Sequence, residues 1–315
     1  MEYPISAQRA RPQSFSRRLQ KDLKKNKELY LLILPVILFY VVFKYGPIFG
    51  LSIAFENFTP VQGFFGNDFV GLKYFKEFFT DYYFARLIKN TIVISFSTLI
   101  FGFPAPIILA LMLNNVSNRL FSRAVQSISY MPHFISTVVI CGMIVQLTTK
   151  EGAITTFLAM FGFPKVTMLN QASMFVPVYI ISGIWQSIGW GSIIYLAALT
   201  NVDQELYDAA DVDGAGKFAK MFHVTLPSIL PTIVIMFILQ VGKMFSIGYE
   251  KIILLYNPLT YSTADVITTY VYRKGLLEGN WSYSTAIGMF DSVINLLLVI
   301  GTNKLSKKIS GMGLW

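Results

Sequence analysis

The sequence predicts an all-α integral membrane protein, and two observations lead to this fold class. Of its 315 residues, 54% are hydrophobic and only 14% are charged, which is too apolar for a soluble domain of this length. The apolar residues also form windows of about 20 residues or more, the length that a spanning helix needs. These windows lie near residues 29–50, 87–113, 124–147, 174–199, 223–245 and 282–303. We therefore expect one domain of six transmembrane helices over residues 29–303.

Basic residues predict the orientation of these helices. An N-terminal arm over residues 1–28 carries Arg9, Arg11, Arg17, Arg18, Lys21, Lys24, Lys25 and Lys27. Positive residues beside a first membrane helix mark its cytoplasmic end. If the chain crosses six times, the other basic clusters fall on the same side: Arg119, Arg123, Lys304, Lys307 and Lys308. Both termini, including a tail over residues 304–315, are thus expected in the cytoplasm. Orientation and contact with anionic lipid account for the net charge of +9, so no nucleic-acid partner is expected.

The connections on the external side contain two further predicted elements. In the first connection, the amphipathic stretch Leu72–Phe79 is expected to lie along the membrane surface. In the last, the segment Tyr261–Leu276 is expected to form a turn followed by a short helix. Prolines within or beside the apolar windows predict a kinked bundle.

A polar, acidic segment over residues 201–222 separates the fourth and fifth windows. Asn201 and Gln204 have the spacing of a capping box, which predicts a short helix beginning near Val202. Gly214 should end that helix in a left-handed turn and let a second short helix lead into the fifth span. Small and acidic side chains on the first helix favour docking of another protein. The alternative is an ordinary capped loop.

The spacing of this segment resembles the EAA loop of bacterial binding-protein-dependent ABC importers. That pattern is Glu-Ala-Ala, three residues, Gly, nine residues, then Ile, any residue and Leu-Pro. The chain matches it at Asp208, Ala209, Ala210, Gly214, Val224, Leu226 and Pro227. Asp208 replaces Glu and Val224 replaces Ile, and Asp203 stands where the family often has Pro.

The resemblance implies a type I importer fold with six transmembrane helices and cytoplasmic coupling helices. Contact with a cytoplasmic ATPase would involve Glu205, Asp208, Ala209, Ala210, Asp213, Gly214, Leu226 and Pro227. ATP and Mg²⁺ would be bound by that ATPase and no cofactor by this chain. Gly214-Ala-Gly216-Lys217 is not a phosphate-binding loop, because Phe218 stands where Ser or Thr must ligate Mg²⁺.

Two further segments resemble the oligosaccharide and polysaccharide branch of carbohydrate-importer permeases: residues 265–273 and Gly313-Leu-Trp315. This implies a permease subunit of the bacterial cytoplasmic membrane that forms half of a sugar path. Its implied partners are a second homologous permease in a heterodimer, two copies of the ATPase and an external solute-binding protein. By resemblance to maltose-type importers, Tyr270, Tyr272 and Arg273 would contact the binding protein. The alternative is a loop that packs on its own domain.

Polar residues within spans are costly in lipid, so they are expected to face the bundle interior or a wet path. These residues are His133, Gln146, Gln186, Gln240, Asp291 and Asn295. In the fourth window, aromatic faces beside an amide suit sugar binding. The predicted substrate path comprises Trp185, Gln186, Trp190, Gln240, Asp291 and Asn295. The alternative roles are helix–helix hydrogen bonds for the polar residues and interfacial anchoring for the tryptophans.

Two rival classes of function are disfavoured by the residues. An ion-coupled secondary transporter of a small polar solute should show inverted repeats and acidic residues near the midplane. The sequence shows no repeat and one such acid, Asp291. A membrane enzyme or a metal site needs a cluster of reactive groups or ligands, and two histidines with one cysteine do not supply it. Cys141 is expected to be a small buried residue.

Overall fold

The computed structural model describes residues 22–63 and 66–314, and the chain forms two compact units, Met1–Ser52 and Ile53–Trp315. The basic residues Arg9 to Lys21 of the arm, and Trp315, lie outside the described residues. The regular elements described are helices, apart from an isolated bridge between Glu56 and Phe69. This agrees with the all-α prediction.

The first unit contains the first apolar window. Helix α2 (Lys27–Tyr40) continues into the π-helical turn η1 (Val41–Tyr45) and the 3₁₀ helix η2 (Gly46–Phe55). Together, Lys27–Phe55 is long and apolar enough to cross a membrane. The window predicted over residues 29–50 is therefore confirmed as a helix.

Four more windows form helices of spanning length in the second unit: Phe84–Asn114, Ala172–Thr200, Lys217–Val241 and Trp281–Ser310. The first consists of α4 (Phe84–Ser97), the π turn η3 (Thr98–Gly102) and α5 (Pro104–Asn114). The second is α9, and the last is α16, which extends the sixth predicted span to Ser310. The third consists of α11 (Lys217–Lys220), the π turn η6 (Met221–Thr225) and α12 (Leu226–Val241).

The predicted window 124–147 forms a bent pair of helices, in keeping with the kinked bundle that the prolines predict. Helix α6 (Arg119–Tyr130) and the 3₁₀ turn η4 (Met131–Phe134) are bent by 101° from α7 (Thr137–Leu147). At the break, Ile135 and Ser136 adopt extended backbone, and the Ser136 hydroxyl accepts a hydrogen bond from the Val139 N–H. The apolar window thus contains a helix stop and an N-cap, which satisfies the first free N–H groups of α7. The chain has six spans only if this bent pair counts as one.

Short helices occupy the connections. They are α3 (Lys73–Thr80), α8 (Ala153–Ala159), η5 (Met168–Asn170), α10 (Gln204–Val212), α13 (Tyr249–Leu255), α14 (Tyr261–Ala264), α15 (Ile267–Tyr272) and η7 (Arg273–Leu277). Helices α14, α15 and η7 confirm the turn and short helix predicted over Tyr261–Leu276.

The amphipathic helix α3 packs one face on protein. Its buried residues, Tyr74 and Phe78, lie against Tyr283 and Phe290 of α16, and the Phe78 and Phe290 ring centroids are 5.5 Å apart. Leu72 and Phe79 are exposed, and the location of Leu72–Phe79 along the membrane surface stays a prediction. Amphipathicity shows that a face is covered but does not identify what covers it.

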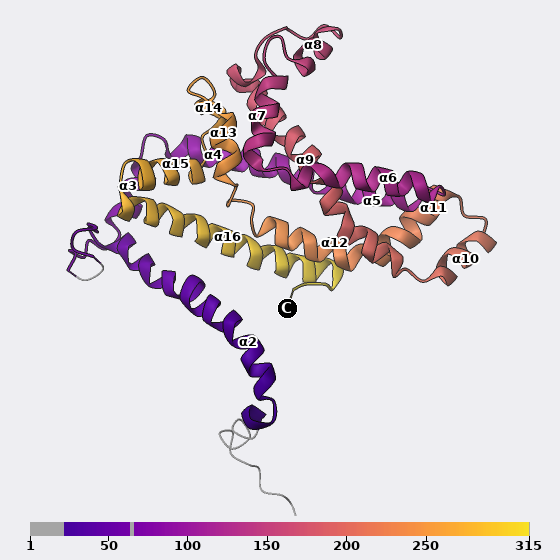
Figure 1. The fold of residues 1–315 in the computed structure, drawn as a ribbon, viewed down its shortest axis with the longest axis horizontal. Coiled ribbons are helices and arrows are strands. Elements are labelled where there is room, and N and C mark those ends of the chain that lie inside the picture. The colour runs from indigo at the N-terminus through magenta and orange to yellow at the C-terminus, as the bar shows by residue number, and fades with distance from the viewer. Residues whose placement is uncertain (1–21, 64–65, 315) are drawn as a thin grey trace, which may run out of the picture. The chain divides into compact units, whose positions relative to one another are not determined.

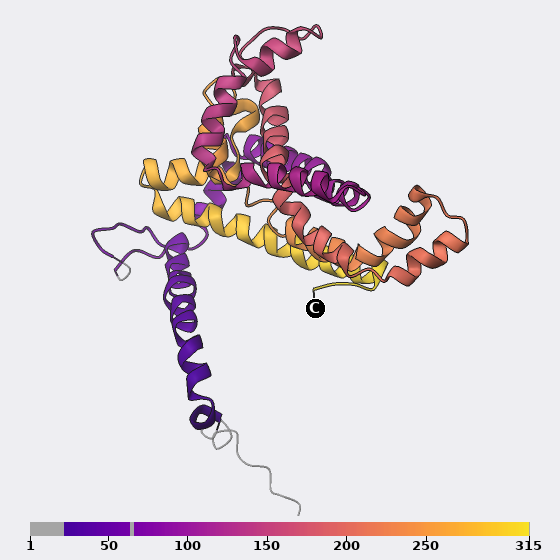
Figure 2. The same cartoon turned by 45° about the vertical axis from the view of Figure 1, so that its right-hand side comes forward.

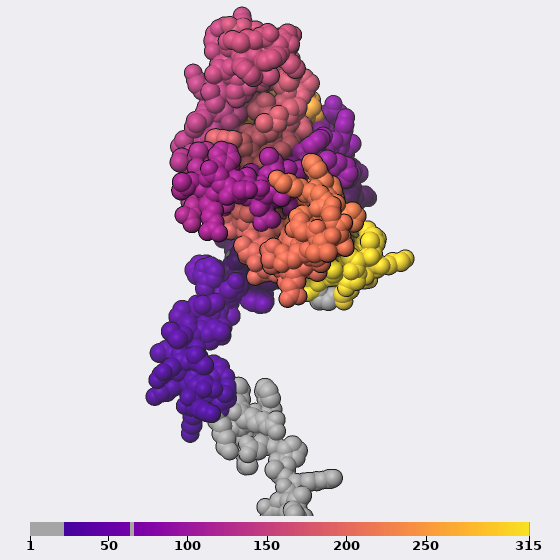
Figure 3. Space-filling view, turned by 90° about the vertical axis from the view of Figure 1, so that its right-hand side faces the viewer, coloured from indigo at the N-terminus to yellow at the C-terminus, as the bar shows by residue number. Residues whose placement is uncertain are grey.

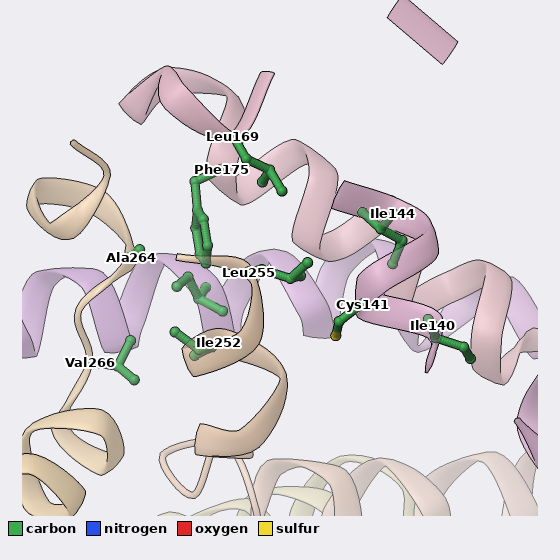
Figure 4. Packing of buried hydrophobic residues seen from close by; sticks show 10 residues of the cluster. Ile140, Cys141, Ile144, Leu169, Phe175, Ile252, Leu255, Ala264 and Val266 are labelled. Carbon is green, nitrogen blue, oxygen red and sulfur yellow. The ribbon is translucent and has the colours of Figure 1, made fainter. Parts of the chain in front are cut away.

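Within the second unit, α10 and α11 lie at one end, while α3 and α15 lie at the opposite end (Figures 1 and 2). Helix α12 runs beside α16, whose C-terminal end points towards the end that carries α10 and α11. A buried cluster joins α7, α9 and α13 through Ile140, Cys141, Phe175, Ile252 and Leu255 (Figure 4). Cys141 is a buried free cysteine, as predicted.

Helices α6 and α9 approach each other most closely at Gly189. A Cβ atom built on Gly189 would lie 2.1 Å from the Ser129 carbonyl oxygen of α6. Real Cβ atoms do not come so close to backbone, so only glycine fits this crossing. The two helix backbones are therefore in direct contact here.

Candidate functional site

The acidic segment between α9 and α12 begins with a well-formed helix cap. Asp203 has extended backbone, and its Oδ1 accepts a hydrogen bond of 3.0 Å from the Glu205 N–H. Asn201 instead donates its side-chain amide to the Ala197 carbonyl of α9. The prediction that Asn201 caps a helix starting near Val202 is therefore wrong. The cap lies two residues later because Asn201 still belongs to the end of α9.

Gly214 forms the predicted left-handed turn after α10, with a φ of +73°. The Gly214 N–H donates to the Asp211 carbonyl, and the Ala215 N–H donates to the Ala210 carbonyl. These bonds satisfy carbonyl groups at the end of the helix, as in a glycine-terminated C-cap. Helix α11 then begins at Lys217 and continues towards α12, as the sequence predicted.

Two side-chain contacts join α10 to the chain that follows it. Lys220 Nζ donates to Asp211 Oδ1 at 2.5 Å, and the Tyr207 and Thr225 hydroxyls are 3.0 Å apart. We call residues 203–222 the coupling segment. Its two short helices are thus held together by contacts within the segment and with Thr225 of η6.

The coupling segment lies at the surface (Figure 3), where it presents both acidic and apolar side chains. Glu205, Asp208, Ala209, Asp213 and Gly214 are exposed, Ala210 is half-buried, and Leu226 packs into a buried cluster at the start of α12, beside exposed Pro227. Sequence reasoning missed four exposed apolar side chains, Leu206, Val212, Phe218 and Phe222. Apolar residues in an otherwise polar loop are the signal that would have found them.

Five of the six predicted path residues line cavities, and Asn295 lines none of these cavities. Gln186 and Trp190 of α9 and Gln240 of α12 line one cavity of about 400 Å³ with Tyr179 and Tyr195, which we call the central cavity. The His133 ring stacks on Trp190, with ring centroids 4.6 Å apart. The structure therefore brings together three of the six predicted path residues.

The other three predicted path residues lie elsewhere. Trp185 lines an apolar cavity formed with α7 and α8. Asp291 lines a cavity near Tyr272 and Trp281. Its Oδ2 accepts a 3.3 Å hydrogen bond from Ser246, while its Oδ1 is buried without a partner. Asn295 donates to the Ser246 hydroxyl and accepts from the Phe245 N–H, so it joins α16 to the segment that follows α12.

Two lysines that sequence reasoning did not single out line the central cavity and its neighbour. Lys251 of α13 lies in the central cavity. Lys243 lies in an adjoining cavity of about 220 Å³, which shares Thr98, Tyr179 and Gln240 with the first. Burial lowers the pKa of Lys251 to about 8, against a small opposing effect of Cys141. A lysine placed in an apolar run, as in Lys251-Ile-Ile-Leu-Leu, was the available signal.

The buried side chain of Asp265 holds together the connection between α12 and α16. Its carboxylate is fully buried and accepts two hydrogen bonds from Arg273, at 2.7 and 3.2 Å, and one from the Thr269 hydroxyl at 2.8 Å. Arg86 of α4 lies 3.9 Å away, and Asn90 donates to the Asp265 carbonyl. Burial lowers the pKa of Arg273, but the hydrogen bonds and the charge of Asp265 raise it, and the net effect is a raised pKa. Such bidentate charged pairs are strong and directional.

The three residues predicted to contact a binding protein all have partners within the chain. Arg273 faces Asp265. Tyr270 is buried and donates to Asp81, which also accepts from Tyr283. Tyr272 stacks on Tyr249, with centroids 5.2 Å apart. Contact between Tyr270, Tyr272 or Arg273 and a binding protein stays a prediction, and it would require Tyr270 to leave its buried position.

The described part of the chain offers no metal centre. Among residues 22–63 and 66–314, no three His, Cys, Asp or Glu side chains lie close enough together to hold an ion. The chemistry of the site therefore consists of hydrogen bonds, aromatic faces and two ammonium groups.

Comparison with known proteins relates these features to a family. Residues 102–311 match the family described as binding-protein-dependent transport system inner membrane component. Protein LplB of Bacillus subtilis (strain 168) is 42% identical over 93% of this chain and 92% of that protein. The polygalacturonan/rhamnogalacturonan transport system permease protein YteP of the same organism is 43% identical over 95% of this chain and 94% of its own length.

A solved structure is similar over nearly the whole chain. It is the crystal structure of a bacterial ABC transporter involved in the import of the acidic polysaccharide alginate, with a TM-score of 0.86 and 40% identity. The match covers 93% of this chain and 99% of that one. A second structure describes a bacterial alginate ABC transporter in complex with an alginate pentasaccharide-bound periplasmic protein, also with a TM-score of 0.86.

Proposed function

Because the chain belongs to the family of binding-protein-dependent transport system inner membrane components, and is therefore a permease subunit of an ABC importer, we propose that its cargo is an oligosaccharide or a polysaccharide fragment. The named cargoes of its relatives support this class: polygalacturonan or rhamnogalacturonan, arabinooligosaccharides and alginate. A role as an ion-coupled secondary transporter is not favoured.

The central cavity carries the proposal for a sugar. Its wall combines the flat face of Trp190, the amides of Gln186 and Gln240, and the phenols of Tyr179 and Tyr195. A sugar ring packs its C–H face on an aromatic ring, while amides and phenols pair with its hydroxyls. Each such hydrogen bond contributes only about 1 kcal/mol net, which suits a site that must release its cargo. The chain would supply half of the path and a second, homologous permease the other half.

Energy for transport would enter through the coupling segment. Its exposed carboxylates and apolar side chains form a surface that fits the groove of a partner, and Gly214 sets the angle between its two helices. The partner would be a cytoplasmic ATPase, present in two copies, which binds ATP and Mg²⁺. The C-terminal end of α16 lies towards the same end of the unit, which supports a cytoplasmic position for both features. We place both termini on the cytoplasmic side of the bacterial cytoplasmic membrane.

Charge reversal at Asp208 tests the docking role. Asp208 is exposed and has no side-chain partner among the described residues, so Asp208→Lys should leave the fold intact. It would put a cation against a surface expected to be basic, and we expect at least a tenfold loss of ATPase that co-purifies with the tagged permease. Glu77→Lys is the matched control, because Glu77 is exposed on short helix α3 at the opposite end of the unit. An intact, coupled complex carrying Asp208→Lys would contradict this role of the segment.

A transport assay tests the cargo. The complete importer, reconstituted in vesicles with its binding protein, should take up a labelled oligosaccharide in an ATP-dependent manner. Failure of every oligosaccharide tested, with intact ATPase assembly, would contradict the cargo class while leaving the family assignment in place.

A further inference from the structure

Lys251 is a partly buried cation that lacks a counter-charge. Its Nζ lies 3.5 Å from the Tyr179 carbonyl oxygen and 5.1 Å from the centroid of the Tyr179 ring. Within residues 22–63 and 66–314 it forms no ion pair. A contact of 3.5 Å is at the limit of a hydrogen bond, and an ammonium group has three donors to satisfy.

No carboxylate of the described residues lines either of the two lysine cavities. Among the residues that the structure describes, the only charged residue lining the central cavity is Lys251, and the only one lining the adjoining cavity is Lys243. The two cavities share Thr98, Tyr179 and Gln240 as lining residues, so the cavities that Lys251 and Lys243 line adjoin each other. Asp291, the acid predicted for the path, lines a different cavity.

Burying a lysine without a partner is costly, and proteins normally pair such groups. The Asp265 site of the same chain illustrates the usual solution, since its buried carboxylate is fully paired with Arg273 and Thr269. A cation left unpaired beside sugar-binding groups is instead the arrangement expected where the counter-charge arrives with the ligand.

We propose that Lys251, assisted by Lys243, binds the carboxylate of an acidic sugar residue, so that the cargo of this permease is an anionic oligosaccharide. This rests on the proposed function and names its substrate class. Gln186 and Gln240 then pair with hydroxyl groups, and Trp190 covers a ring face. The two lysines add charge selectivity, because a neutral sugar would leave both ammonium groups unpaired.

The alternative role for Lys251 is structural. Its alkyl chain and ammonium group contact Tyr179 of α9, and a cation over an aromatic ring contributes to packing by itself. A structural lysine would affect every cargo equally, whereas a carboxylate ligand affects only acidic cargo. The test therefore compares two probes that differ in this one group.

The complete importer, with its binding protein and ATPase, is reconstituted in vesicles. The probes are a labelled uronic-acid oligosaccharide and its carboxyl-reduced, neutral counterpart. We expect Lys251→Met to lower the uptake of the acidic probe at limiting concentration about tenfold, the effect of one charged hydrogen bond. Lys251→Arg should retain most of that uptake. Lys308→Met is the matched control, because Lys308 is exposed at the end of α16, away from both cavities.

The pH profile provides a second readout. Lys251 is charged below its pKa of about 8 and neutral above it, so uptake of the acidic probe by the wild type should fall as the pH rises through about 8. Arginine stays charged throughout this range, so Lys251→Arg should not show this fall. The other titratable groups around Lys251 are Cys141 of α7, the Tyr179 phenol of α9 and Glu250 of its own helix, and all of them are present in both proteins. Tyr272 of α15 stacks on Tyr249 and not on Lys251.

The outcomes are distinct. A loss confined to the acidic probe, with the pH difference between wild type and Lys251→Arg, supports the proposal. Equal loss of both probes in Lys251→Met, or uptake of the neutral probe alone by the wild type, overturns the carboxylate site and leaves the sugar-import function standing. Uptake of neither probe nor of any other oligosaccharide overturns both.

Discussion

Replacing Arg273 with methionine should destabilise the membrane domain, because it removes the main partner of a fully buried carboxylate. Asp265 would lose two hydrogen bonds, at 2.7 and 3.2 Å. Removing one partner of a buried pair typically costs about 3–5 kcal/mol. Arg86, at 3.9 Å, and the Thr269 hydroxyl would still stabilise the charge, so we place the loss near the lower end, at about 3 kcal/mol. At 2–4 °C per kcal/mol this lowers the melting temperature by roughly 6–12 °C.

Thermal unfolding of the purified complex in detergent measures this effect. The matched control is Lys274→Met, which removes a neighbouring cation whose partner, Glu278, is at the surface; exposed pairs contribute about 0–1 kcal/mol. Binding-protein stimulation of the ATPase is measured in parallel. If Arg273→Met melts like Lys274→Met but loses this stimulation, the buried-pair reasoning is refuted and a direct contact with the binding protein is favoured.

Three further substitutions test other parts of the structure. Gly189→Ala should prevent normal packing of α6 on α9 and lower the yield of purified protein, because its methyl group would lie 2.1 Å from the Ser129 carbonyl oxygen. The control is Gly288→Ala on α16, where nothing lies within 4 Å of the added methyl group, and it should be purified in normal yield. Similar yields of the two variants would contradict this prediction. Gly214→Val places a β-branched residue at a φ of +73°, at a local cost of ~1–3 kcal/mol, and should uncouple uptake from ATP hydrolysis or abolish assembly. Asp291→Asn should assemble but change uptake, since Asp291 has a buried oxygen without a partner; unchanged uptake and ATPase activity would show that it only fills the bundle.

The sequence was most informative where one residue type is required by local geometry. Gly214 was correctly predicted as a left-handed turn, since few other residues adopt that backbone. The helix cap was not, because Asn201 and Asp203 are both good capping residues and the choice depends on where α9 ends. The break at Ser136 was missed for a related reason. The residues on both sides of Ser136 are apolar, so the mean hydropathy of this stretch is high whether the helix is continuous or broken.

Long-range pairings were the least predictable part of the site. Gln186 and Gln240 were selected for the substrate path by their polarity within apolar windows, and Trp190 by its aromatic face; they line one cavity, and their role in the path stays a prediction. The criterion of polarity also selected Asn295, which joins α16 to the segment that follows α12. Lys251 was overlooked because a lysine is by default placed at a surface. Its position in the cavity depends on the packing of α13 against α7, which no local pattern encodes.

The crossing with α6 at Gly189 is a pivot point about which helix α9 would tilt. Helix α9 has 29 residues. Leu199 lies near the end of α9 that leads into the coupling segment, ten residues after Gly189. Tyr179, which lines both lysine cavities, lies ten residues before Gly189. At 1.5 Å per residue, the two arms are each about 15 Å long. Because the α9 backbone contacts α6 at Gly189, a tilt of α9 about this crossing that moves the Leu199 end by a few ångströms would move Tyr179 by a similar distance in the opposite direction.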